Sequence, residues 1–138
     1  MLKVEVQQNV EADQLKRSLC QVIVASAKQI PEIVVLEVAA QWQQWIPHLE
    51  ETALYFNEVI SDEGLVWVFK GVSNFYEGQG LYAAAQSWLQ IGLAVIEDRL
   101  GSNHCDTATS LNNLAIVYQM TGRYIDAEPL FMRALQIY

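Results

Sequence analysis

Apolar residues recur at steps of three and four along most of the chain, which is the spacing of one face of an α-helix. The first such set follows Glu11 and consists of Ala12, Leu15, Leu19, Val22, Ile23 and Ala27. It predicts an amphipathic helix that ends before Pro31, because the residue before a proline avoids the α conformation. Residues 1–10 lack this period, and we expect them to form a flexible or extended start.

Further helical stretches follow, each bounded by a turn or a capping residue. We expect them over residues 31–44, 47–60, 65–77, 83–100 and, as a final pair, 107–138. Two of them open with Pro31 or Pro47, at the first-turn position that proline favours. The final pair begins after Asp106, which we predict to be its N-cap. The chain therefore predicts about seven helices with short connections, in which neighbours run antiparallel, and no strand.

The last two predicted hairpins, residues 65–106 and 107–138, are copies of one another at a shift of 42. Large residues meet large ones and small residues meet small ones, so that two helix backbones can approach closely. The matching pairs are Phe69/Leu111, Val72/Leu114, Ser73/Ala115, Tyr76/Tyr118, Gly80/Gly122, Tyr82/Tyr124, Ala85/Ala127, Leu89/Phe131, Gly92/Ala134 and Leu93/Leu135. One hairpin cannot bury its own apolar face, so the copies must stack.

These positions resemble the tetratricopeptide repeat. The stretch 100–135 is similar to the 42-residue variant found in kinesin light chains and many bacterial repeat proteins, with Cys105 where the linker usually has proline. The resemblance covers residues 65–138. It implies an all-α fold in which antiparallel hairpins stack as a short right-handed superhelix. Within the N-terminal region 11–64, residues 31–60 would be a degenerate third hairpin that lacks the tyrosine and glycine positions.

Composition narrows the class of protein. The 138 residues, 52% of them apolar and 17% charged, suit one folded domain and not a disordered chain. The net charge is −8 and no lysines or arginines cluster, which argues against binding to nucleic acid. The start is too polar for a signal peptide, and Lys28, Pro31, Glu32 and Glu37 interrupt the most apolar region. We expect a soluble, cytoplasmic protein with no membrane span.

The candidate chemistry is confined to His104, Cys105 and Asp106, which offer a nucleophile set or part of a zinc site. Adjacent residues rarely give the geometry of a catalytic triad, and a zinc site needs four ligands at suitable spacing. The resemblance explains the histidine and the aspartate as linker and cap. The four tryptophans fall at helix-packing positions. We therefore expect no enzyme activity, no metal and no cofactor.

The polar residues on the first helix of each hairpin carry the functional prediction. In tetratricopeptide arrays this helix lines the concave groove. The groove-side positions that the resemblance implies are Lys70, Asn74, Thr109, Asn112, Asn113, Ile116 and Gln119, with Trp67 and Glu77 on the same face. An amide both donates and accepts, so it can hold a peptide backbone without demanding a given side chain. The alternative is a solvated polar face. A terminal-carboxylate clamp is not favoured, because Lys70 is the single cation among these positions.

We therefore predict a protein-binding scaffold that holds a peptide or protein segment in its groove. The rival prediction comes from residues 45–51, which resemble the segment before such repeats in bacterial signalling proteins with a nucleotide-binding domain. In that case the chain would be a regulatory or sensor fragment of a larger nucleotide-dependent signalling protein (STAND-type) and would make intramolecular contacts. The chain itself has no phosphate-binding loop.

The C-terminal hairpin predicts a further contact. The sequence stops at Tyr138, inside the last helical pattern, and no polar capping helix follows. We expect the exposed apolar face of this hairpin to pair with another copy of the chain, as a homo-oligomer, or to be covered by residues outside this sequence.

Overall fold

The computed structural model describes residues 2–30, 36–55, 57–58 and 60–138, and within them it contains seven α-helices and no strand. The helices are α1 (Leu2–Lys28), α2 (Leu36–Trp42), α3 (Ile46–Tyr55), α4 (Asp62–Gly78), α5 (Tyr82–Leu100), α6 (Cys105–Met120) and α7 (Tyr124–Ile137). The predicted all-α class is confirmed. No helix in these ranges is long and apolar enough to cross a membrane.

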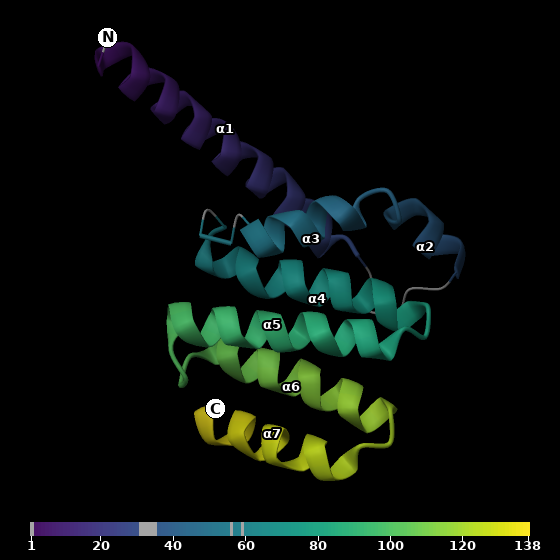
Figure 1. Ribbon diagram of the computed structural model, residues 1–138. Coiled ribbons are helices and arrows are strands. Elements are labelled where there is room, and N and C mark those ends of the chain that lie inside the picture. Colours follow the sequence, from purple (N-terminus) through teal and green to yellow (C-terminus); the bar gives the residue numbers. More distant parts are fainter. Residues whose placement is uncertain (1, 31–35, 56, 59) are drawn as a thin grey trace.

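Helices α4 to α7 lie side by side in chain order, and α1 runs away from this stack towards its free N-terminal end (Figure 1). Each stacked helix packs mainly on its neighbours in sequence, whereas α1, α2 and α3 all pack on α4. Helix α4 is therefore covered from both sides. Its nine buried residues include Leu65, Val68, Phe69 and Val72, and they form the centre of the largest apolar cluster.

The two repeated hairpins turn in the same way. At the end of α4, Gly80 has φ of 74°, and at the end of α6, Gly122 has φ of 77°. In both turns the residue after the glycine donates a backbone hydrogen bond to the tyrosine five positions earlier, Leu81 to Tyr76 at 2.9 Å and Arg123 to Tyr118 at 2.8 Å. This closure needs a left-handed residue, which glycine adopts without steric cost. The shift of 42 thus holds for the turn geometry as well as for the sequence.

The predicted start of the first helix is wrong. Helix α1 begins at Leu2 and not near Glu11. No glycine or proline lies between residues 2 and 28, and adding residues to an existing helix costs far less than starting one. The expected extended or flexible start is replaced by helix.

The predicted buried face of α1 is also largely wrong. Leu15, Leu19 and Val22 are 62%, 54% and 59% exposed, while the stripe Cys20, Val24 and Ala27 is buried against the rest of the chain. Both sets have the helical spacing, so the period alone could not distinguish them. The C-terminal part of α1 contacts α4 through the second stripe and leaves most of the first in water.

Helix boundaries between residues 36 and 65 differ from those predicted. Helix α3 ends at Tyr55 and not near Ile60, and Asn57 then donates from its side chain to the carbonyl of Ala53 at 3.2 Å. Helix α4 begins at Asp62, three residues before the predicted Leu65, and its acidic first turn suits the positive end of the helix dipole. The predicted start at Pro31 lies outside the described residues. The degenerate hairpin over 31–60 stays a prediction.

Candidate functional site: a groove between α4 and α6

The first helices of the two repeated hairpins enclose a cavity of about 310 Å³ on one side of the stack. Lys70, Ser73, Asn74 and Glu77 line it from α4, Leu89 lines it from α5, and Asn113, Ile116 and Met120 line it from α6. We call this cavity the α4–α6 groove. It lies where the resemblance predicts the concave binding face.

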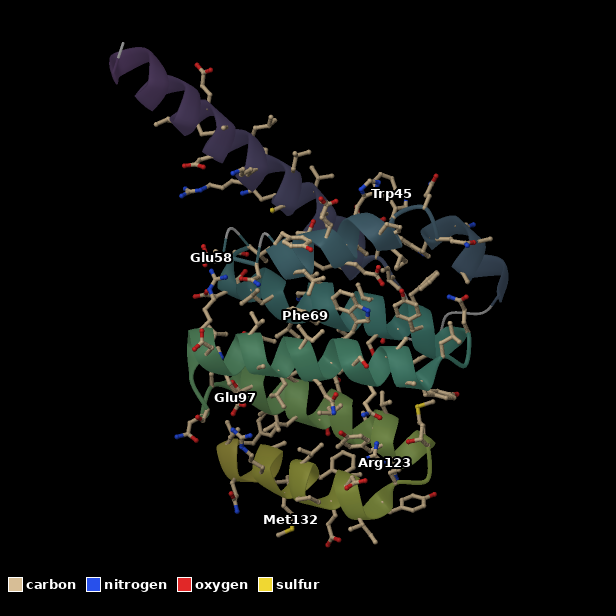
Figure 2. The ribbon with its side chains drawn as sticks, viewed as in Figure 1. Trp45, Glu58, Phe69, Glu97, Arg123 and Met132 are labelled. Carbon is tan, nitrogen blue, oxygen red and sulfur yellow. The ribbon has the colours of Figure 1, made fainter. Side chains whose placement is uncertain are left out.

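The helical period explains why these side chains meet. On α4, Lys70, Asn74 and Glu77 follow one another at steps of four and three, while Phe69 and Val72 point from another side into the core. Phe69 points from α4 towards α5 (Figure 2). On α6, Asn113, Ile116 and Met120 repeat the same kind of spacing. One face of each helix is thus available for binding and the other is used for packing.

Asn74 is the unusual residue of the groove. It is 8% exposed, and its amide makes no hydrogen bond to any residue that the structure describes. The other buried polar side chains in those ranges are bonded: Thr52 to His48, Ser73 to Glu77, Thr107 to Gly101 and Ser110 to Asp106, at 2.6 to 2.9 Å. The polar atoms of the Asn74 amide still reach solvent, since the described residues contain no fully buried side-chain nitrogen or oxygen without a partner. Asn74 therefore presents donors and an acceptor to the open cavity.

Asn113 lines the same groove from α6 and is half-buried. Its amide also forms no hydrogen bond within the described residues. Two amides from neighbouring helices, each with free donors and a free acceptor, can satisfy the N–H and C=O groups of one peptide backbone.

Glu77 is the acid of the groove wall. The Ser73 hydroxyl donates to its Oε1 at 2.6 Å. Burial raises the pKa of the Glu77 carboxyl above its ordinary value of 4.5, while the bond from Ser73 and the charge of Lys70 lower that pKa by less. The charged form of Glu77 therefore lacks full compensation inside this groove.

The structure brings together four of the seven predicted site residues, Lys70, Asn74, Asn113 and Ile116. The other three, Thr109, Asn112 and Gln119, do not line the groove. The Thr109 hydroxyl donates instead to the carbonyl of Cys105 at 3.1 Å. Asn112 is one residue from Asn113, which turns its side chain by about 100° around the helix.

Three lining residues were not among the predicted set: Ser73, Leu89 and Met120. Met120 lies four positions after Ile116, so the helical period could have found it. Leu89 belongs to the second helix of its hairpin, and no pattern on the first helix points to it.

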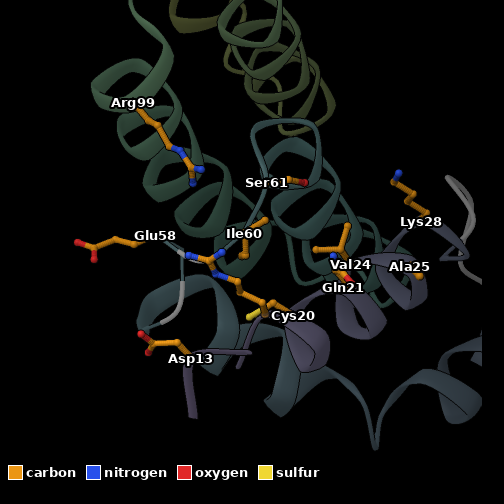
Figure 3. Close-up of a pocket in the computed structure, with 11 residues that line it drawn as sticks. Asp13, Cys20, Gln21, Val24, Ala25, Lys28, Glu58, Ile60, Ser61 and Arg99 are labelled. Atoms are coloured by element: carbon orange, nitrogen blue, oxygen red, sulfur yellow. The ribbon is translucent and has the colours of Figure 1, made fainter. Parts of the chain in front are cut away.

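A larger cavity, of about 640 Å³, lies where α1 meets the start of α4 and the end of α5 (Figure 3). Its charged residues include Asp13, Glu58 and Arg99, and Arg99 is already bonded to Asp62 at 2.9 Å and to the carbonyl of Asn57 at 2.7 Å. Its buried lining residues, Cys20, Val24 and Ile60, are apolar. It offers no buried polar side chain comparable to Asn74, so we place the candidate site in the α4–α6 groove.

The cluster His104, Cys105 and Asp106 has a structural role. Its ligand-type atoms lie within 4.8 Å of one another. However, Nδ1 of His104 accepts a hydrogen bond from the backbone N–H of Asp106 at 3.1 Å and so caps α6. The predicted N-cap, Asp106, is wrong: it lies in the first turn. The positive end of the helix dipole also disfavours a cation at this place.

A stack of antiparallel helical hairpins that repeat at a shift of 42 residues defines a helical-repeat fold. A family model described as "Tetratricopeptide repeat" matches residues 64–138, more than half of the chain, so the chain belongs to the tetratricopeptide repeat family. Repeats of this family are generally protein–protein interaction modules, and the fold is generally a non-enzymatic scaffold. No curated protein matches the chain.

Proposed function

We propose that the protein is an interaction scaffold that holds an extended peptide or protein segment in the α4–α6 groove. The observation that carries the proposal is Asn74, which is buried, faces the cavity and has no hydrogen-bond partner among the described residues. The amide reaches water through the cavity, so its donors and its acceptor are available to a bound backbone. A hydrogen bond between the amide and that backbone replaces one to water and contributes about 0.5–1.5 kcal/mol.

The amides of the groove favour an extended segment over a helix. An extended chain leaves its backbone N–H and C=O groups free, whereas a helix bonds them internally. These free groups are the ones that Asn74 and Asn113 can bond.

A second candidate function is that of a regulatory part of a larger nucleotide-dependent signalling protein. The exposed side chains of Leu15, Leu19 and Val22 on α1 favour it, because an apolar stripe in water suits contact with another part of the same protein. In this case the stripe, and not the groove, would be the principal contact surface.

A peptide array separates the two functions. We expect the wild-type chain to bind a subset of arrayed segments, and the double variant Asn74→Ala/Asn113→Ala to lose that binding. Asn112→Ala is the matched control, because it removes an amide from the same helix outside the groove. Equal binding by the double variant and the wild type would exclude the groove. Binding that is lost on Leu15→Ser/Leu19→Ser, with the groove variants unchanged, would support the second function.

A further inference from the structure

We propose that the segment held in the α4–α6 groove carries a lysine or arginine, whose charged group pairs with the Glu77 carboxylate. This inference rests on the proposed function and adds the chemistry of the partner. The ligand would be a basic segment, and not an acidic segment or a terminal carboxylate.

Glu77 belongs to the wall of the groove, and the Ser73 hydroxyl already donates to its Oε1. A segment that fills the groove displaces the water that still reaches this carboxyl group. A carboxylate that loses water is costly unless a cation approaches it or it takes up a proton. A cationic side chain of the partner removes that cost.

The groove that contains Glu77 also has an apolar lining. Leu89, Ile116 and Met120 are apolar, and Met120 is 52% exposed. Lysine and arginine have long aliphatic stems that pack along apolar surface while their charged ends reach a polar partner. A methionine adapts its shape to such a stem. The groove thus offers both an apolar surface and an acid at one end.

Negative charge predominates on the stripe of α4 that includes Glu77. This stripe contains Glu63, Lys70 and Glu77 at intervals of seven residues, so it carries two acids and one base. The whole chain has a net charge of −8, which attracts a basic partner and repels an acidic one.

An acidic segment fits the groove less well. Lys70 is the one cation in the lining of the cavity, and its charge already acts on Glu77, whose pKa it lowers. Lys28 also lies near this face, with its Nζ 5.9 Å from the ring centroid of Trp67, but it does not line the groove. An acidic side chain in the groove would meet the Glu77 carboxylate without a second lysine to balance it.

The test uses a phage-displayed library of random peptides in which Lys, Arg, Asp and Glu are equally frequent. We expect the full chain to select peptides with Lys or Arg at one fixed position. For the best such peptide, Glu77→Gln should weaken the affinity about tenfold. Asp98→Asn, an exposed acid of α5 outside the groove, should leave the affinity unchanged. Circular dichroism of both variants checks that they fold.

Three outcomes would overturn the inference. The first is that the selected peptides show no preference for basic residues, or prefer acidic ones, while Asn74→Ala/Asn113→Ala still abolishes their binding. This result would refute the basic partner and leave the proposed groove unaffected. An unchanged affinity for Glu77→Gln would do the same. If the wild type selects no peptide at all, both the inference and the proposed function fail.

Discussion

The hairpins α4–α5 and α6–α7 share one framework, but their helices are held apart by different pairs of side chains. In the first hairpin Gly92 of α5 lies against Phe69 of α4, and in the second Ala134 of α7 belongs to one cluster with Leu111 of α6. The larger ring faces the glycine and the smaller leucine faces the alanine. In both hairpins the two helices therefore approach closely, because a larger side chain on the first helix is matched by a smaller residue on the second.

Among the variants that test this comparison, Gly92→Ala is expected to lower the stability most. A Cβ at this position would lie 2.6 Å from Cγ and 2.8 Å from Cβ of Phe69. Cβ of Phe69 moves only with the backbone, and Cγ moves only if the buried ring leaves its rotamer. We expect a loss of about 1–3 kcal/mol in the free energy of unfolding, although alanine is the better helix former. Urea denaturation followed by circular dichroism measures this loss.

The control is the double variant Phe69→Leu/Gly92→Ala, which gives the first hairpin the pair found in the second. It should be clearly more stable than the sum of the two single changes predicts. Additive effects would show that the two positions are independent, and the explanation by matched side-chain sizes would be wrong.

A smaller change in stability is expected when leucines at equivalent positions of the two hairpins are replaced by alanine. Leu93 of α5 is half-buried and packs against residues of α6 and α7, whereas Leu135 of α7 is 72% exposed. Leu93→Ala should cost about 1–1.5 kcal/mol and Leu135→Ala less than about 0.5 kcal/mol. A similar cost for both, measured by the same denaturation, would mean that α7 is covered in solution.

The outer face of α7 is expected to mediate self-association. Ile125, Met132 and Leu135 are 89%, 55% and 72% exposed, and Met132 points away from the stack (Figure 2). Exposed apolar side chains at steps of seven and three share one face of a helix, and such a face favours contact with another molecule. Analytical ultracentrifugation should show dimers or larger species that weaken on Ile125→Ser/Leu135→Ser. A wild-type chain that is monomeric at all concentrations would disprove this expectation.

The smallest effect concerns Glu77, whose equivalent in the second hairpin is the exposed Gln119. The folded-state pKa of Glu77 is raised, so its ionisation opposes folding, and the stability of the wild type falls as pH rises through that pKa. Glu77→Gln should therefore unfold at an equal or slightly higher temperature at neutral pH. Melting curves at acid and neutral pH test this, and a lower Tm of the variant at neutral pH would contradict it.

The repeated half of the fold could be predicted because ten positions that specify packing and turns have a counterpart at a shift of 42. The N-terminal half lacks the tyrosine and glycine positions of the repeat. Its spacing showed which residues share a face of α1, but only the neighbouring helices decide that Cys20 and Val24 are covered and that Leu15 and Leu19 are not.

The residues that line the groove also depend on how neighbouring helices pack, which the sequence pattern does not show. The sequence predicted both Asn112 and Asn113, but only the angle at which α6 packs beside α4 decides which amide faces Asn74. The lack of a hydrogen-bond partner at Asn74 depends on every neighbour at once, so no pattern in the sequence could reveal it.

The most direct test of the groove follows the side-chain amide resonances of the asparagines by NMR while a peptide selected from the library is titrated. We expect the signals of Asn74 and Asn113 to shift together and to saturate with the binding curve, whereas the signal of Asn112 stays in place. Binding that moves Asn112 or the residues of α7 and leaves Asn74 unchanged would contradict it.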